Sequence, residues 1–241
     1  MLLRCERWSI RPVGQPRQTS GAGRLRIRGW LLGELPDPIK VKGDPSVIRR
    51  YVLGATGHDG TSSIVIKNVA TRVVCANTLG VALGERGGAS WRITHTANAK
   101  QRLDEAGKAF RRLADSYVRF GELANVLAVT PFTDQQMQAT VDRIMPVPQD
   151  DRDHDRLEAE RAKVIQLFET AIGIERVRGT AWAALQGWTE YADHHRAVRD
   201  TGREDPRRAR LSSIWMGRSA SMKQSALSAI AHEAGIHLAA A

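Results

Sequence analysis

The sequence predicts an α+β fold, with an antiparallel β-meander in the N-terminal half followed by a mostly helical C-terminal half with one long helix. Two observations predict this fold. Up to residue 96, short apolar runs alternate with polar residues at the two-residue period of a strand, and turn residues separate the runs. After residue 96, apolar residues recur at spacings of three and four, the period of a helix. We therefore expect one domain over residues 24–241, with the sheet over residues 24–96 and helices over residues 97–241.

Six runs in the first half have the pattern of strands. They cover residues 25–32, 39–42, 50–55, 63–67, 72–76 and 90–94. Between the third and fourth runs, Gly57-His58-Asp59-Gly60 contains the Asp-Gly pair that is typical of a tight hairpin. A His-Asp pair also occurs in metal-dependent phosphohydrolases, but no other His or Asp has a matching ligand spacing, so we interpret the segment as a turn. Asn77 and Thr78 are expected to cap a short helix over residues 78–83.

The second half begins with an apolar stripe that predicts a helix of about thirty residues, roughly 45 Å long. The stripe consists of Leu103, Ala106, Phe110, Leu113, Tyr117, Phe120, Ala124 and Leu127. Thr133 and Gln136 predict a capping box for a second helix. Further helices are expected over residues 156–171, 181–199 and 220–234, with an exposed linker over residues 200–210. The stripe of Trp182, Leu185, Trp188, Tyr191 and His195 is interpreted as core in preference to a base-stacking surface.

The charge of the chain predicts a polyanionic partner. The formal net charge is +10 in 241 residues. Residues 1–96 carry 15 Lys or Arg against 6 Asp or Glu (+9), residues 97–175 carry 11 against 14 (−3), and residues 176–241 carry 10 against 6 (+4). This uneven distribution favours a basic face. Residues 1–23 have no periodicity and are expected to form a disordered basic arm.

The same composition excludes several classes. No stretch approaches the roughly 18 apolar residues that cross a bilayer, so no membrane partner is expected. Cys5 and Cys75 are the two cysteines, which excludes a disulfide scaffold and indicates a cytoplasmic protein. The sequence contains no phosphate-binding Gly-rich loop, dinucleotide fingerprint, zinc-finger spacing or nucleophile elbow. We therefore assign no cofactor, no metal and no catalytic residue.

Several segments resemble a family of phage and plasmid proteins of unknown function. The resemblance depends on residues 51–53, 58–62, 71–79, 95–96, 190–194 and 217–223, and the run around Cys75 is its most specific part. The family implies an origin in actinobacterial phages, plasmids or laterally acquired regions. Its members have a longer segment before the first strand, so the resemblance implies an N-terminally truncated member. Because the family has no agreed function, it supplies no catalytic residues.

The function expected from charge and resemblance is nucleic-acid binding, in recombination or replication, by binding or annealing single-stranded DNA. The layout of sheet and long helix is similar to that of phage single-strand annealing proteins, which is an analogy of fold alone. The residues expected to contact DNA are Arg24, Arg26, Arg28, Lys67, Arg72, Arg92, Arg207, Arg208 and Arg210. Two alternatives stay open: a hydrolase that uses Cys75 or His58, and a homo-oligomeric interaction protein without catalysis.

Overall fold

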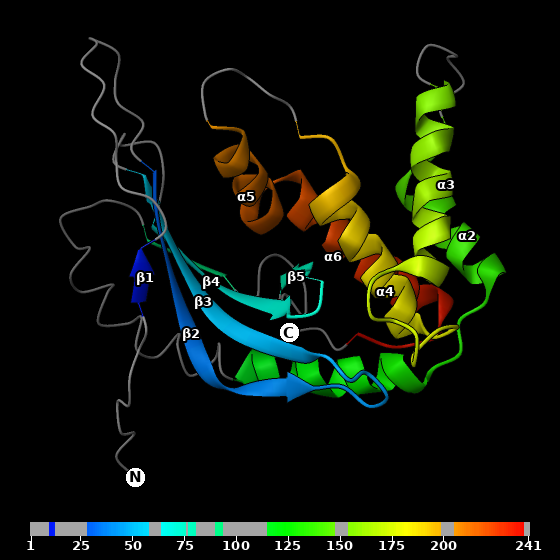
Figure 1. Ribbon diagram of the computed structural model, residues 1–241, viewed down its shortest axis with the longest axis horizontal. Helices are drawn as coiled ribbons and strands as arrows, with labels where there is room; N and C mark the ends of the chain where they lie inside the picture. The colour runs from blue at the N-terminus through cyan, green and yellow to red at the C-terminus, as the bar shows by residue number, and fades with distance from the viewer. Residues whose placement is uncertain are drawn as a thin grey trace.

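The α+β class is confirmed, with antiparallel strands in the N-terminal half and a mostly helical C-terminal half that contains a long bent helix. The computed structural model describes residues 10–12, 28–57, 64–75, 77–80, 90–93, 115–147, 154–198 and 205–238. The strands are β1 (Ile10–Pro12), β2 (Arg28–Lys40), β3 (Val47–Gly57), β4 (Ile64–Arg72), β5 (Asn77–Gly80) and β6 (Ser90–Ile93). A helix over residues 115–129 follows, then α2 (Asp134–Ile144), α3 (His154–Thr170), α4 (Ala181–Glu190), the π-helical turn η2 (Tyr191–His195), α5 (Pro206–Met216) and α6 (Arg218–Glu233). The long β2 and β3 run beside one another, and the helices gather at one end of these strands (Figure 1).

All strand pairs are antiparallel, in the order β1-β2-β3-β4-β5, and β6 pairs with β4. Residues 28–32 and 39–40, from the strands predicted over residues 25–32 and 39–42, belong to one strand, β2, which has a register irregularity between Leu35 and Ile39. Pro36 and Pro38 lie inside the irregularity, where a missing backbone donor disturbs no regular ladder. Asp37, between the two prolines, has a left-handed φ of 61°. The two prolines therefore mark a local distortion of a continuous strand.

The predictions around residues 72–78 are wrong. Residues 72–76 were expected to form a strand, but β4 ends at Arg72 and residues 73–75 form a turn. Val73 and Val74 are 50% and 49% exposed, so their apolar character does not reflect burial in a strand. Asn77 does not cap a helix, because it begins β5 and pairs with Arg72. The Asp-Gly turn predicted at residues 57–60 lies largely outside the described residues.

The predictions for the helices agree better with the structure. Thr133 and Gln136 form the predicted capping box at the start of α2, and Thr180 caps α4. The linker predicted over residues 200–210 is wrong from residue 205 onward, since Asp205 accepts hydrogen bonds from the amides of Arg207 and Arg208 as the N-cap of α5. Pro206 favours a helix there because proline suits the first helical position. For the predicted long helix, the described part covers residues 115–129.

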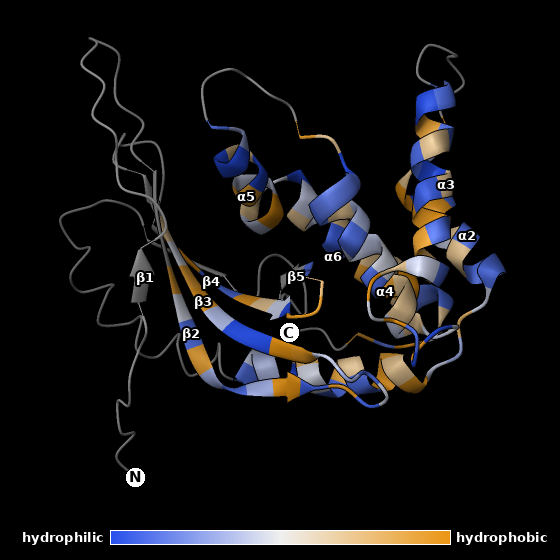
Figure 2. Cartoon of the chain, in the orientation of Figure 1, coloured by the Kyte–Doolittle hydropathy of each residue, from blue (hydrophilic) through white to orange (hydrophobic). Residues whose placement is uncertain are grey.

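Two hydrophobic clusters cover opposite faces of the sheet. Ile48 and Ala70 belong to a large cluster shared with the 115–129 helix, α2, α3, α4 and α6. Leu53 and Val69 belong to a smaller cluster with Trp215 of α5. The even-numbered residues Ile48 and Ala70 and the odd-numbered residues Leu53 and Val69 belong to different clusters because side chains alternate across a strand. Figure 2 shows polar and apolar bands along β2 and β3. Each fully buried Leu or Ile stabilises the fold by about 1.5–3 kcal/mol.

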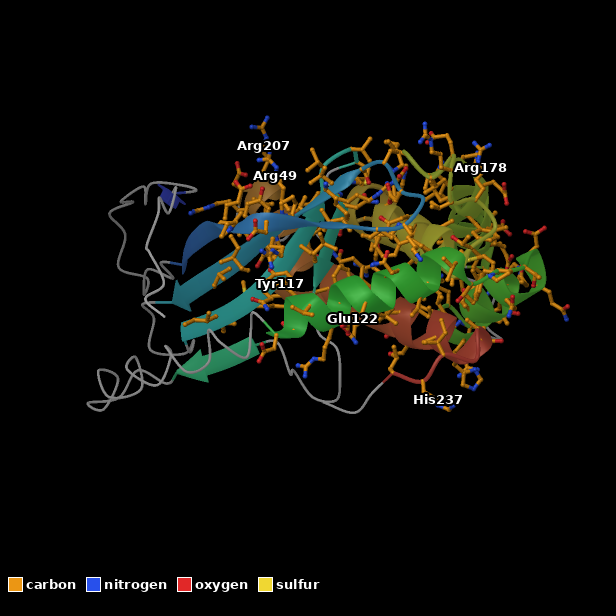
Figure 3. All side chains as sticks on the ribbon, turned by 90° about the horizontal axis from the view of Figure 1, so that it is seen from below. Arg49, Tyr117, Glu122, Arg178, Arg207 and His237 are labelled. Atoms are coloured by element: carbon orange, nitrogen blue, oxygen red, sulfur yellow. The ribbon has the colours of Figure 1, made fainter. Side chains whose placement is uncertain are left out.

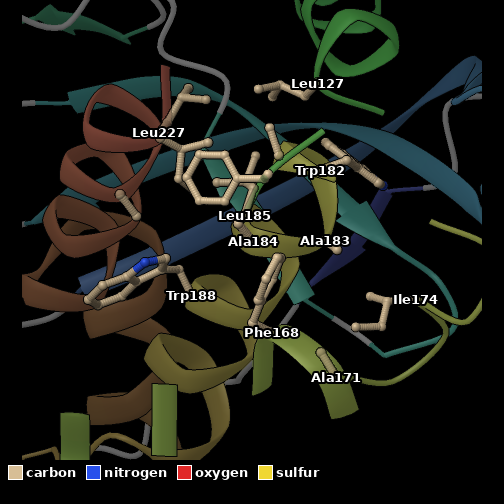
Figure 4. Close-up of a cluster of buried hydrophobic side chains, with 14 of the residues drawn as sticks. Leu127, Phe168, Ala171, Ile174, Trp182, Ala183, Ala184, Leu185, Trp188 and Leu227 are labelled. Carbon is tan, nitrogen blue, oxygen red and sulfur yellow. The ribbon is translucent and has the colours of Figure 1, made fainter. Parts of the chain in front are cut away.

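The aromatic stripe of α4 lies in the core, as predicted. Trp182 and Trp188 are fully buried, and Leu185 and Tyr191 are 1% exposed. Figure 4 shows the tryptophans packed around Leu185, Phe168 and Leu227. The four buried residues therefore offer no face on which a base could stack, whereas His195, the fifth residue of the predicted stripe, has a 37% exposed side chain.

Tyr117 connects the 115–129 helix directly to the β-ladder (Figure 3). Its hydroxyl accepts hydrogen bonds from the amides of Tyr51 and Val69, at 3.1 and 3.0 Å. It lies 2.5 and 2.9 Å from the carbonyl oxygens of the same residues, which are paired across β3 and β4. Burial raises the pKa of this phenol far above its usual range. A neutral hydroxyl from the helix therefore completes the hydrogen bonding between two strands.

Candidate functional site

Several charged and amide side chains are buried or half-buried in β4, β5, α4, η2 and α6. We call seven of them the polar cluster: Lys67, Arg72, Asn77, Gln186, Glu190, Asp193 and Lys223. Six are buried, and Lys67 is half-buried. Such groups are costly to bury unless they are paired or hydrogen-bonded. The partners of each member therefore indicate what the site can do.

Arg72 forms a bidentate ion pair with Asp44, which lies in the loop between β2 and β3. Arg72 Nε and Nη2 donate to the two carboxylate oxygens of Asp44, both at 2.9 Å, and both side chains are completely buried. Arg72 also donates to the carbonyl oxygens of Ile172 and Gly173, at 2.7 and 2.5 Å. The guanidinium therefore joins the sheet to the loop before α4. Its position contradicts the prediction that Arg72 contacts DNA, because no part of it reaches solvent.

The Asp44 carboxylate is held in its charged form by its donors. Burial alone would raise its pKa, but hydrogen bonds from Arg72, Ser46 and Trp182 outweigh burial and lower the pKa below 3.8. Trp182 Nε1 donates to Asp44 Oδ2 at 2.8 Å. This fully satisfied pair fixes the position of α4 relative to the sheet.

A second buried ion pair lies between η2 and α6. Lys223 Nζ donates to Asp193 Oδ1 at 2.6 Å, and the side chains are 3% and 1% exposed. Lys67 lies nearby on β4 and donates to the carbonyl oxygen of Trp215 at 3.0 Å. Burial, and then repulsion by the Lys223 ammonium, lower the pKa of Lys67. Arg210 Nη1 donates to the carbonyl oxygens of Asp193 and Arg196, at 3.0 and 3.2 Å. The Asp193 side chain therefore pairs with Lys223, and its backbone oxygen accepts a hydrogen bond from Arg210.

Asn77 and Gln186 are completely buried amides without partners among the described residues. Asn77 pairs with Arg72 and so shares its face of the hairpin. Gln186 lies one helical turn from Trp182 and one from Glu190, so the three side chains share one face of the helix. Each unsatisfied buried group costs about 1–3 kcal/mol.

The π-helical turn η2 positions Asp193 and two histidines. It follows α4 directly, and π-helical turns are often found at functional sites. His194 Nε2 lies 3.1 Å from the carbonyl oxygen of Cys75, and His195 Nε2 lies 3.8 Å from Glu190 Oε1. Glu190 Oε2 in turn accepts a hydrogen bond from the amide of Ile172. These contacts attach η2 to the β4–β5 hairpin. Through Glu190 they also attach it to the loop before α4, whose carbonyl oxygens accept hydrogen bonds from Arg72.

Cys75 does not have the environment of a nucleophile. Its thiol is 7% exposed, and burial raises its pKa despite the nearby Arg72 guanidinium. His194 contacts Cys75 from a distant part of the sequence, but its ring nitrogen lies against the backbone oxygen of Cys75 and not against the sulfur. A reactive thiol needs a lowered pKa and an adjacent base, so this geometry argues against the hydrolase alternative that uses Cys75. His58 lies outside the described residues.

The other residues that were predicted to contact DNA lie in different elements of the fold. Arg207 is exposed near the start of α5, while Arg208 and Arg210 are half-buried. Arg28 begins β2 and Arg92 lies in β6, and Arg24 and Arg26 lie outside the described residues. The structure brings Arg210 to the backbone oxygen of Asp193, a contact that sequence reasoning did not anticipate.

A family model for a domain of unknown function, DUF932, matches residues 13–215. The chain belongs to the DUF932 family. No curated protein and no solved structure matches it. Within the described ranges, no helix of this DUF932 protein combines the length and apolarity needed to cross a membrane. In those same ranges, no three His, Cys, Asp or Glu side chains are grouped in a way that would hold a metal ion.

Sequence reasoning missed most of the polar cluster of this DUF932 protein. Gln186, Glu190, Asp193 and Lys223 were not selected as site residues, although Glu190, Asp193 and Lys223 lie in segments that carry the family resemblance. A usable signal was present in α4 and η2, where Gln186, Glu190 and Asp193 interrupt an otherwise apolar face at helical spacing. Polar residues on a core-facing stripe indicate a buried polar contact.

Proposed function

We propose that this protein binds nucleic acid, and that it serves recombination or replication of a phage or plasmid by holding single-stranded DNA. The observation that supports the proposal best is a basic face. Figure 3 shows Arg49, Arg178 and Arg207 projecting from one side of the molecule. The three residues come from β3, from the loop before α4 and from α5, and all are exposed. We call these three residues the basic face.

The arginines of this face are available for phosphates. Arg49 contacts Glu34 at 3.4 Å, but the two side chains are 52% and 42% exposed. A solvent-exposed pair of this kind contributes about 0–1 kcal/mol, so a phosphate can replace the carboxylate. Guanidinium groups bind phosphate oxygens through two parallel hydrogen bonds. The net charge of +10 would add long-range attraction for a polyanion.

Fluorescence anisotropy with labelled single- and double-stranded oligonucleotides, repeated at several salt concentrations, tests the proposal. For about six phosphate contacts, the log–log slope of the binding constant against salt is about −4 on single strands. The triple variant Arg49→Gln/Arg178→Gln/Arg207→Gln should reduce the magnitude of this slope by about 2, since each lost contact removes about 0.7.

A matched control separates local contacts from the loss of charge alone. Arg119 is an exposed arginine on the 115–129 helix. Arg207→Gln and Arg119→Gln remove the same charge, but the first should reduce the slope by about 0.7 and the second should leave it unchanged. Equal effects of the two variants, or no binding at low salt, would overturn the proposal.

A further inference from the structure

The outward face of the 115–129 helix carries three exposed valines; we call it the valine face. Val118, Val126 and Val129 are 60%, 45% and 62% exposed. At about 100° per residue, these side chains and Glu122 between them fall within about 80° of the helix circumference. Figure 3 shows this helix, with Glu122, on the side of the molecule toward the viewer. The opposite side of the helix packs in the large hydrophobic cluster. The helix therefore has two apolar sides, and one of them is turned to solvent.

The valines of this face are not explained by the stability of the chain itself. None of the three belongs to the hydrophobic clusters that the described residues form. Valine also loses rotamer freedom in a helix, so it suits an exposed helical position less well than alanine, lysine or glutamate. Single exposed apolar side chains are common, but several in one stripe mark a contact surface. A partner that buries the stripe accounts for its composition.

The charges on the valine face indicate the kind of partner. Arg119 and Glu122 are exposed, and within the described ranges no hydrogen bond or ion pair joins either side chain to another group. Asp115, one turn before Arg119, is exposed as well. Two acidic side chains against one basic side chain make a polyanion a poor partner. Charges of both signs on one helix face instead complement the same face when it is turned round.

We infer that the valine face binds the valine face of a second copy of this chain, with the two helices antiparallel. A two-fold axis at Glu122 places Val118 of each copy against Val126 of the other. It also places Arg119 of each copy about 4.5 Å along the helix axis from Glu122 of the other, within reach of an arginine side chain. Two arginines thus neutralise the two glutamates at the axis.

The size of the contact determines its strength. A helix of 15 residues is about 22 Å long and about 10 Å wide, so the contact covers on the order of 200 Å² per copy. Stable complexes bury about 800 Å² per partner. The self-association is therefore weak and depends on protein concentration. It requires no nucleic acid and goes beyond the proposed function.

Sedimentation equilibrium without nucleic acid, over about a hundredfold range of protein concentration, tests the inference. The mass of the wild type should rise from that of one chain toward that of two. Val118→Glu should weaken this association about tenfold or more, because it places a charge in an apolar contact twice per dimer. Its melting temperature should stay at the wild-type value, since the side chain is exposed. Val73→Glu, at an exposed valine outside the face, is the matched control and should associate like the wild type.

Exchange of charges tests the antiparallel pairing directly. Arg119→Glu and Glu122→Arg should each weaken the association, because each sets like charges opposite one another. An equimolar mixture of the two variants should associate again, since the charges of one variant then meet opposite charges on the other. Pairing within one chain cannot produce this rescue.

Three results would overturn the inference. They are a wild type that stays a single chain at every concentration, equal effects of Val118→Glu and Val73→Glu, and a mixture of the charge variants that associates no better than either alone. The basic face contains none of these residues, so the salt slope of DNA binding is a separate measurement. The failure of either proposal therefore leaves the other standing.

Discussion

Replacement of Arg72 with Met tests whether the buried ion pair holds the helices on the sheet. The change removes five hydrogen bonds: two to Asp44, two to the carbonyl oxygens of Ile172 and Gly173, and one weak contact to the sulfur of Cys75. It also leaves the carboxylate of Asp44 completely buried without its guanidinium. Breaking a buried pair in this way costs about 3–5 kcal/mol. Since a whole domain is stable by about 5–15 kcal/mol, this loss is a large fraction of the total.

Urea unfolding followed by tryptophan fluorescence measures this loss. The urea midpoint should fall, and in a separate thermal scan the melting temperature should fall by roughly 10 °C, because each kcal/mol corresponds to about 2–4 °C in a chain of this size. Arg49→Met is the matched control, since it breaks the exposed pair with Glu34 and should cost less than about 1 kcal/mol. In a double-mutant cycle, Arg72→Met/Asp44→Leu should be more stable than the sum of the single changes predicts, by about 0.5–3 kcal/mol. A loss no larger for Arg72→Met than for Arg49→Met would refute the reasoning.

Three further predictions concern buried groups. Gln186→Met removes two unsatisfied polar atoms and should raise the free energy of unfolding by about 1–3 kcal/mol; a loss of stability would reveal a partner for the amide. The pKa of Asp44 is lower in the folded protein than its ordinary 3.8, so the stability it contributes is complete above about pH 5 and is lost as pH falls through 3.8 toward the folded value. Acid unfolding should therefore be shallower in Asp44→Asn than in the wild type. In a Cys5→Ser background, Cys75 should react with a maleimide only as fast as the protein opens, because burial raises its pKa; rapid labelling of the folded protein would contradict its buried position.

The parts of the fold that the sequence predicted are those set by local patterns. The period change after residue 96 indicated the sheet and the helices, and the capping box at Thr133 indicated where α2 begins. The turn at residues 73–75 was missed because two exposed valines have the composition of a strand. What distinguishes them from strand residues is the pairing of Arg72 with Asn77, which depends on sheet register and not on composition.

The candidate site was harder to predict because its contacts are distant in sequence. Arg72 meets Asp44 across 28 positions, and Lys223 meets Asp193 across 30. No spacing rule indicates such pairs. The nine arginines and lysines chosen from the sequence were selected by charge alone, and charge does not distinguish exposed Arg207 from buried Arg72. Burial, which decides between the two roles, follows from packing of the whole chain.

The Tyr117 hydroxyl makes two backbone amides into reporters of the contact between helix and sheet. The amide hydrogens of Tyr51 and Val69 are bonded to this hydroxyl. They can therefore exchange with solvent deuterium when the 115–129 helix lifts from the sheet, even while the other pairs of β3 and β4 stay protected. In the wild type, both amides should exchange at one common rate. In Tyr117→Phe, they should exchange faster than their neighbours along the same strands. Opening of the helix is thus measurable separately from unfolding of the sheet, at two identified positions in one spectrum.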